Sequence, residues 1–227
     1  MPDDILQVGG LEGPEVDDSQ AVTQLRERAA TGLERGLGFI EDYGDELAIL
    51  RAHVALEAAS PSDVIEQVAG GQREDGAFEP FGFVFSGAIS GELRAAALDP
   101  GLVGTLEALA ILADVRGLVS PTAERAVEHL PRAQRQDGSC GSVDPTAPEK
   151  SPAEDRLFST GMLAGYAMRT PFVRPEVVEW AGRFLTKLWS PERVEGGRLS
   201  AIAAFAHFFA NGGAPDLSDE ALQWCGR

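Results

Sequence analysis

Positive charge is scarce in this sequence, and lysine is almost missing from it. The 227 residues include 19 lysines and arginines against 36 aspartates and glutamates, which gives a formal net charge of −17. Lys150 and Lys187 are the only lysines. Because nucleic acids and anionic membranes would be repelled by a surface of this charge, we exclude both as primary binding partners.

Cysteine, histidine and long apolar runs are also rare. The two cysteines, Cys140 and Cys225, cannot form a disulfide framework, and neither belongs to a CxxC pair. With only three histidines in the chain, no ligand set of zinc type is present, so we expect no metal and no cofactor. The N-terminus lacks a signal-peptide pattern, and no window approaches the ~20 apolar residues that span a bilayer. These absences predict a cytoplasmic protein without a transmembrane segment.

The remaining pattern is helical and indicates one folded domain. Residues 1–20 are acidic and poor in apolar side chains, which is typical of a flexible arm. From residue 21 to 227, apolar residues recur at spacings of three and four, so we expect a single all-α domain. Four segments are apolar on more than one face and are expected to be inner helices, near residues 46–59, 101–115, 154–169 and 198–210. The segments between them are amphipathic and are expected to be outer helices.

An internal repeat connects these helices. The segment QREDGAF, from Gln72 to Phe78, has a near copy in QRQDGSC, from Gln134 to Cys140, and each follows an amphipathic helix. Asp-Gly supplies the left-handed backbone that ends a helix, and the glutamine can bond the freed backbone groups. We therefore expect Gln72 and Gln134 to make equivalent contacts. The unit is an outer helix, a QxxDG turn, a variable loop and an inner helix.

The two QRxDG turns resemble the repeat of the prenyltransferase and squalene-hopene cyclase superfamily, which includes the class II terpene cyclases. The resemblance covers most of residues 21–227. It implies an α/α toroid in which an inner ring of helices is wrapped by an outer ring. An aromatic residue usually follows the turn in that family; Phe78 takes this place in the first copy, but Cys140 takes it in the second. The chain has room for about four hairpins, so the implied toroid is small, incomplete or completed by a partner chain.

The resemblance also suggests a place for a catalytic acid. Class II cyclases carry a DxDD motif at the start of an inner helix, where it protonates an alkene or epoxide, and this sequence has no DxDD. The aligned position holds Glu154 and Asp155, followed by Arg156. One of the two acids could serve as the proton donor if its neighbours kept it neutral. The alternative is an ordinary acidic helix start with a surface ion pair.

Aromatic residues are the candidate substrate-binding groups. They gather in one loop and on the expected inner helices, where they would contact an isoprenoid chain or stabilise a carbocation. The candidates are Phe78, Phe81, Phe83, Phe85, Phe158, Tyr166, Phe205 and His207. The alternative for the helical members is packing in the core, and for His207 it is a buried histidine with satisfied hydrogen bonds.

Two functions follow from this pattern. The first is a terpene cyclase-like isomerase that cyclises an isoprenoid or other apolar polyene in an aromatic-lined hydrophobic cavity. The second is a non-catalytic protein that keeps the toroid but lacks the acid motif, and either holds a hydrophobic ligand or acts as a partner subunit or homo-oligomer. Glycoside hydrolysis on an α/α barrel is a third possibility, but no motif supports it.

Overall fold

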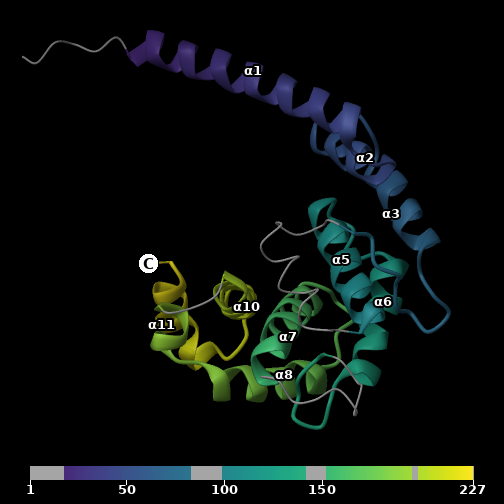
Figure 1. The fold of residues 1–227 in the computed structure, drawn as a ribbon, viewed down its shortest axis with the longest axis vertical. Coiled ribbons are helices and arrows are strands. Elements are labelled where there is room, and N and C mark those ends of the chain that lie inside the picture. Colours follow the sequence, from purple (N-terminus) through teal and green to yellow (C-terminus); the bar gives the residue numbers. More distant parts are fainter. Residues whose placement is uncertain (1–17, 83–98, 142–151, 196–198, 227) are drawn as a thin grey trace, which may run out of the picture. The chain divides into compact units, whose positions relative to one another are not determined.

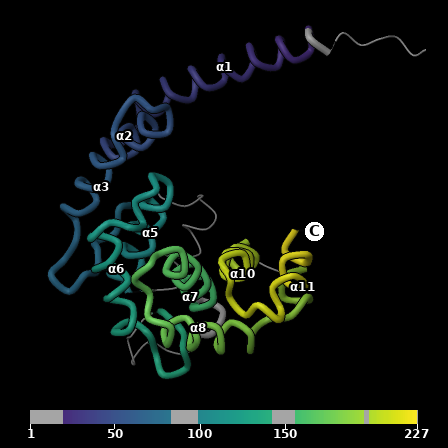
Figure 2. The backbone as a smooth tube through the Cα atoms, turned by 180° about the vertical axis from the view of Figure 1, so that it is seen from behind, coloured from purple at the N-terminus to yellow at the C-terminus, as the bar shows by residue number. Residues whose placement is uncertain are grey.

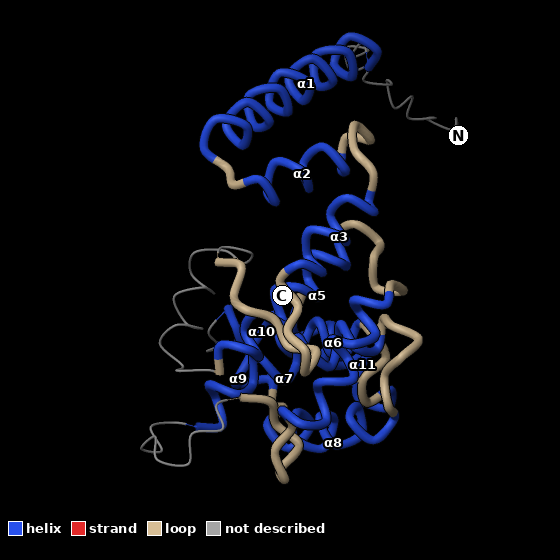
Figure 3. Tube along the Cα trace, turned by 90° about the vertical axis from the view of Figure 1, so that its right-hand side faces the viewer, coloured by secondary structure: helices blue, strands red, loops and turns tan. Residues whose placement is uncertain are grey.

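The computed structural model describes residues 18–82, 99–141, 152–195 and 199–226, with side chains from residue 20 in the first range and from residue 156 in the third. Helices and connecting loops account for these residues, as Figure 3 shows, and the only bridges of β type among them are isolated ones. The prediction of an all-α chain is therefore confirmed. In the described ranges, no helix has both the length and the apolar character needed to cross a membrane.

The chain forms two compact units, Met1–Ala52 and His53–Arg227. The first unit contains α1 (Asp18–Tyr43) and the start of α2 (Glu46–Ala55). Asp45 caps α2 by accepting a hydrogen bond from the backbone N–H of Ala48 at 2.7 Å. The expected inner helix over residues 46–59 differs from what is found, because α2 ends at Ala55 and has no buried side chain. The expected boundary of the arm near residue 20 falls inside α1.

The second unit carries the helices that alternate in character. They are α3 (Pro61–Gly70), α5 (Pro100–Asp114), α6 (Pro121–Ala133), α7 (Pro152–Met168), α8 (Pro175–Leu188), α9 (Pro191–Glu195), α10 (Leu199–Ala210) and α11 (Pro215–Cys225). All but α10 begin with proline, whose fixed φ and missing N–H suit the first helical position. Ser60 and Asp63 form a reciprocal capping box at α3. The expected helices near 101–115, 154–169 and 198–210 correspond to α5, α7 and α10.

The three central helices lie in a row, with α7 in contact with both α5 and α10, as Figures 1 and 2 show from opposite sides. Every described residue of α7 from Leu157 to Ala167 is buried, and α5 is buried from Leu102 to Leu112 except at Val103. By contrast, α3, α6 and α8 each bury one face. Of the apolar segments, α5 and α7 are thus enclosed, whereas α10 is buried on one face only.

The two QRxDG turns make the same hydrogen bonds. The Nε2 group of Gln72 donates to the carbonyl of Gly76 at 3.0 Å and to that of Thr122 at 3.1 Å. Nε2 of Gln134 donates to the carbonyl of Gly138 at 3.1 Å and to that of Val177 at 2.9 Å. Thr122 and Val177 both lie in the first turn of the following amphipathic helix. The predicted equivalence of the two glutamines is confirmed.

Inside each turn the aspartate and glycine also act alike. The carboxylate of Asp75 accepts from the backbone N–H of Ala77 at 3.2 Å, and that of Asp137 accepts from the N–H of Ser139 at 3.1 Å. The turn glycines have left-handed backbones, with φ of 89° at Gly76 and 87° at Gly138. A Cβ at Gly138 would overlap the carbonyl of Trp180 on α8. The turn therefore needs glycine both for its backbone conformation and for contact with the next helix.

This double requirement predicts a large effect of Gly138→Ala. We expect the substitution to lower the free energy of unfolding by about 2 kcal/mol or more, because it adds overlap with α8 to left-handed strain. Gly212→Ala is the matched control: its φ is 94°, but a Cβ there would meet no atom within 4 Å. Its cost should therefore be about 1 kcal/mol, from backbone strain alone. Urea unfolding followed by circular dichroism measures both, and equal losses would contradict the proposed contact.

Candidate functional site

The two predicted catalytic acids, Glu154 and Asp155, lie at the start of α7. Since α7 begins at Pro152, Glu154 and Asp155 belong to its first turn, at the start of a helix that is enclosed from Leu157 onward. Their side chains lie outside the described residues. The backbone thus places both acids at the beginning of a central helix, directly after the loop that follows the second QRxDG turn.

The next residue, Arg156, is engaged with the second turn. Its Nη2 group donates to the carboxylate of Asp137 at 3.0 Å, with the arginine side chain 15% exposed. Burial raises the pKa of Asp137, but hydrogen bonds from Ser139 and the nearby guanidinium of Arg156 outweigh it, so the pKa lies below its usual value. This ion pair joins the start of α7 to the turn.

Cys140 follows this turn and is unreactive in its surroundings. Its side chain is buried, and burial together with the charge of Asp137 raises the thiol pKa to about 12. Its backbone carbonyl accepts a hydrogen bond from the Ser159 hydroxyl, and its backbone N–H donates to Thr160 Oγ1 at 2.8 Å. Cys140 therefore connects the turn to α7 through its backbone and stays protonated at neutral pH.

Two aromatic candidates meet at the start of the phenylalanine-rich loop. The rings of Phe78 and Phe81 have centroids 6.0 Å apart, and Phe78 is fully buried. The buried carboxylate of Glu107 on α5 accepts from the backbone N–H of Phe81 at 2.6 Å and from that of Gly82 at 3.3 Å. Phe83 and Phe85 lie outside the described residues. Sequence reasoning did not include Glu107 among the predicted site residues. It could have been found, because it is the single carboxylate in the middle of an otherwise apolar helix.

Two other candidates lie in the protein interior. Phe158 is 3% exposed. Phe205 is fully buried, with its ring 5.0 Å from that of Trp189 and 6.1 Å from that of Phe209. Phe205 belongs to a cluster formed mainly by α8, α10 and α11. In this structure it therefore packs in the core, the alternative that the sequence left open.

The structure brings the remaining two candidates together. Tyr166 on α7 and His207 on α10 have ring centroids 4.3 Å apart. Gly165 permits this contact, because a Cβ at that position would overlap the imidazole of His207. The Nε2 atom of His207 is buried and has no hydrogen-bond partner. An unsatisfied buried polar atom costs about 1–3 kcal/mol, and this nitrogen lies against Gly165 of α7.

His207 is neutral at physiological pH. Burial lowers its pKa from 6.5 to about 4, and the positive charge of Arg169 acts in the same direction. The guanidinium of Arg169 lies 5.8 Å from the centroid of the Tyr166 ring. The imidazole can therefore exchange hydrogen bonds with a neutral polar group but does not bring a positive charge to the site.

His207 continues an incompletely covered face of α10. Ile202, Ala203 and Ala206 are half-buried at helical spacing with it, whereas Ala204, Phe205 and Phe208 on the other side are buried. Thus α10 presents an apolar stripe that ends in one neutral polar group. This arrangement suits an apolar ligand that carries a single polar function.

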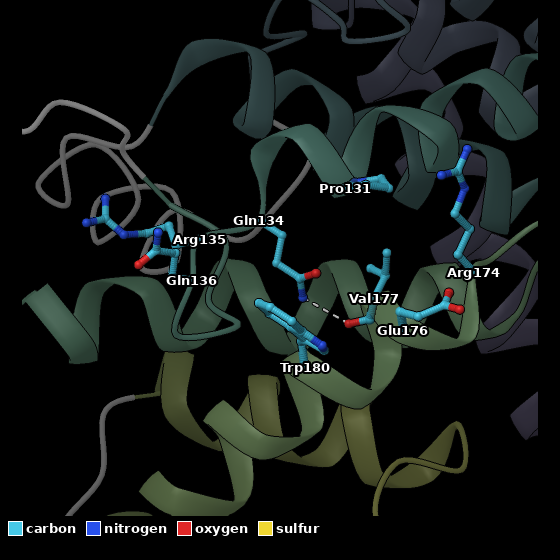
Figure 4. A pocket seen from close by; sticks show the side chains of 8 residues that line it. All are labelled: Pro131, Gln134, Arg135, Gln136, Arg174, Glu176, Val177 and Trp180. Atoms are coloured by element: carbon cyan, nitrogen blue, oxygen red, sulfur yellow. Dashed lines mark hydrogen bonds between the residues drawn. The ribbon is translucent and has the colours of Figure 1, made fainter.

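A separate surface groove lies between α6 and α8, beside the second turn (Figure 4). Its volume is about 370 Å³, and it is lined by Pro131, Gln134, Arg135, Gln136, Arg174, Glu176, Val177 and Trp180. Arg135 and Arg174 lie at opposite ends, with Gln134 and Trp180 between them. The predicted substrate-binding residues are not among those that line this groove. It therefore does not correspond to the aromatic-lined cavity expected from the sequence.

Comparison with known proteins gives no assignment for these features. No protein-family model, curated protein or solved structure matches this chain. The likeness to the cyclase superfamily thus rests on the two QRxDG turns and remains a prediction.

The lowered pKa of His207 predicts a specific pH dependence of stability. Between its unfolded value of 6.5 and its folded value of about 4, the unfolded chain binds a proton that the folded chain does not. His207 should therefore reduce the free energy of unfolding as the pH falls from 7 to 4. In thermal unfolding at several pH values, the stability of the wild type relative to His207→Gln should decline over this range. A difference that stays constant with pH would show that the imidazole is not shielded from water.

Proposed function

We propose that this chain is a hydrophobic-ligand-binding protein that holds an isoprenoid-like molecule against the central helices α7 and α10. The observation that carries the proposal is His207, a neutral imidazole whose Nε2 atom is buried without a partner beside Tyr166. A terpenoid alcohol would supply the missing hydrogen bond through its hydroxyl group and cover the apolar stripe of α10 with its chain.

The composition of the surrounding helices supports this ligand class. Tyr166 and Ile202 would offer aromatic and aliphatic contacts, and burial of apolar surface contributes roughly 25 cal/mol per Å². Among the described residues, no group of three or more His, Cys, Asp and Glu side chains is placed to hold a metal ion. Binding through apolar contact and one hydrogen bond does not require a metal ion.

A matched pair of ligands tests the binding role. In equilibrium dialysis, we expect the purified protein to retain farnesol and the hydrocarbon farnesene, which share a similar chain but differ in the hydroxyl group. His207→Leu should weaken farnesol binding by about tenfold, which corresponds to one hydrogen bond of about 1.4 kcal/mol. Farnesene binding should change little. Tyr166→Ala should weaken both, because it removes contact area.

Two results would contradict this role. In the first, the wild-type protein retains neither ligand above a background level. That background is measured with Gly138→Ala protein that has been unfolded in urea. In the second, His207→Leu weakens binding of the alcohol and of the hydrocarbon equally. That result would show that His207 does not bond the hydroxyl group.

Cyclisation is the second candidate function, and the position of Glu154 and Asp155 favours it. Both lie in the first turn of α7, where the resembling cyclases place their acid. In this role one of them would donate a proton to a terminal double bond of the polyene, and the aromatic faces would stabilise the carbocation that results. The acid must be neutral before it donates the proton, so its neighbours must hold its pKa high.

The acid role predicts a selective loss of activity. With squalene or another polyene as substrate and gas chromatography with mass spectrometry as readout, either Glu154→Gln or Asp155→Asn should lower product formation by about 10²- to 10⁴-fold. Circular dichroism checks that the variant remains folded. Absence of any cyclic product from the wild-type protein, or full activity of both variants, would leave ligand binding without catalysis as the function.

A further inference from the structure

The surface groove between α6 and α8 combines positive charge with an exposed aromatic ring. Two arginines, Arg135 and Arg174, line it against one carboxylate, that of Glu176. Because the whole chain has a net charge of −17, the lining of the groove differs in sign from the chain as a whole. Trp180 lies between the two arginines (Figure 4) and is 43% exposed. Exposed tryptophans are frequent anchors of binding surfaces, since they offer a large apolar area.

Comparison of the two repeats shows that the turn itself does not require this tryptophan. In both repeats, the turn glutamine bonds a carbonyl in the first turn of the next outer helix, that of Thr122 in the first and that of Val177 in the second. Three residues farther on, a Cβ on the turn glycine would overlap the carbonyl of Arg125 in the first repeat and of Trp180 in the second. Arg125 and Trp180 are therefore equivalent positions, and the contact they share uses only their backbones.

The arginine at the start of α8 is not required by the turn either. The same alignment of α6 with α8 places Arg174 at the position of Val119. Among the described residues, no carboxylate pairs with Arg174, and its side chain makes no capping hydrogen bond to α8. Neither the guanidinium of Arg174 nor the indole of Trp180 thus contributes to the contacts that the two repeats share. Both groups can bind a ligand without loss of those contacts.

The spacing of these groups requires an extended ligand. Trp180 follows Arg174 by six residues, which is a rise of about 9 Å along α8. Arg135 lies on the far side of Trp180 (Figure 4). A compact anion such as phosphate therefore reaches only one of the two arginines. An extended peptide rises about 3.1 to 3.4 Å per residue, so two acidic residues four positions apart are separated by about 12 to 14 Å. Such a peptide reaches both arginines and crosses the indole.

We propose that this groove binds an acidic, extended peptide segment of a partner protein. The carboxylates of the peptide pair with Arg135 and Arg174, and a proline or aliphatic residue between them packs on Trp180. The groove lies on outer helices, away from the ligand proposed for α7 and α10. Since exposed ion pairs contribute little each, we expect a dissociation constant of about 10 to 100 μM. Nucleic acid is the disfavoured occupant, because the net charge of −17 repels its phosphates.

Isothermal titration calorimetry of the full chain with three peptides, acetylated and amidated at their ends, tests the ligand class. Glu-Ala-Pro-Ala-Glu should bind most tightly. Its isomer Ala-Glu-Glu-Pro-Ala should bind about threefold more weakly, because adjacent carboxylates reach one arginine only. Gln-Ala-Pro-Ala-Gln, which lacks both charges, should bind about tenfold more weakly. Equal affinities for the three peptides, no binding of the first, or tighter binding of a thymidine pentanucleotide would overturn the proposal.

Variants of the chain locate the site of binding. With Glu-Ala-Pro-Ala-Glu as the probe, Arg174→Ala should weaken binding about threefold and Trp180→Ala about fivefold. The matched control Arg125→Ala removes an exposed guanidinium from α6 outside the groove and should change binding little. Glu176→Gln should strengthen binding about threefold, because it removes the one carboxylate of the lining; a misfolded variant would not give this gain. Equal losses in Arg174→Ala and Arg125→Ala, unchanged binding in Trp180→Ala, or no gain in Glu176→Gln would contradict the proposed site.

Discussion

In each repeat of the second unit, the side-chain amide of one glutamine stabilises the QRxDG turn and joins it to the next outer helix. Each QRxDG turn must reverse the chain after an amphipathic helix and leave few backbone groups unpaired, because buried polar groups without partners are costly. Gln72 and Gln134 solve this problem in the same way: Nε2 reaches a carbonyl of its own turn and a carbonyl at the start of the next outer helix. One side chain thus closes the turn and determines where the following helix lies. Glutamate could not replace it, because an ionised carboxylate has no proton to donate.

Two glycines allow the central helices α7 and α10 to approach each other closely. Gly161 and Gly165 lie one turn apart on α7, and a Cβ at either position would overlap residues of α10, Ala204 at the first and His207 at the second. The close approach of α7 and α10 therefore depends on these two positions. The same approach puts the imidazole of His207 against Tyr166 and shields it from water. The low pKa of His207 is thus a consequence of helix packing, and the candidate ligand site is a product of the same contact.

Much of the fold could be predicted because it depends on local spacing. The period of apolar residues located the helices, and the enclosure of α5 and α7 followed from their apolar residues on more than one face, whereas α10, expected to be enclosed as well, is buried on one face only. The equivalent hydrogen bonding of the two turns was predicted from their shared QRxDG sequence. The prediction failed for the segment after Asp45, where an apolar composition suggested an enclosed helix but α2 has no buried side chain. Composition shows that a helix can be buried; whether it is buried depends on neighbours that lie elsewhere in the chain.

The candidate site was less predictable, since it depends on which side chains meet. The sequence by itself determined the helices, the turn chemistry and the placement of Glu154 and Asp155 at a helix start, because these follow from interactions between residues a few positions apart. Only the tertiary structure decided that Phe205 packs with Trp189 in the core while His207, two residues later, reaches Tyr166 with a free nitrogen. Adjacent positions on a helix point in different directions, and which direction meets a neighbouring helix is set by packing between segments far apart in sequence.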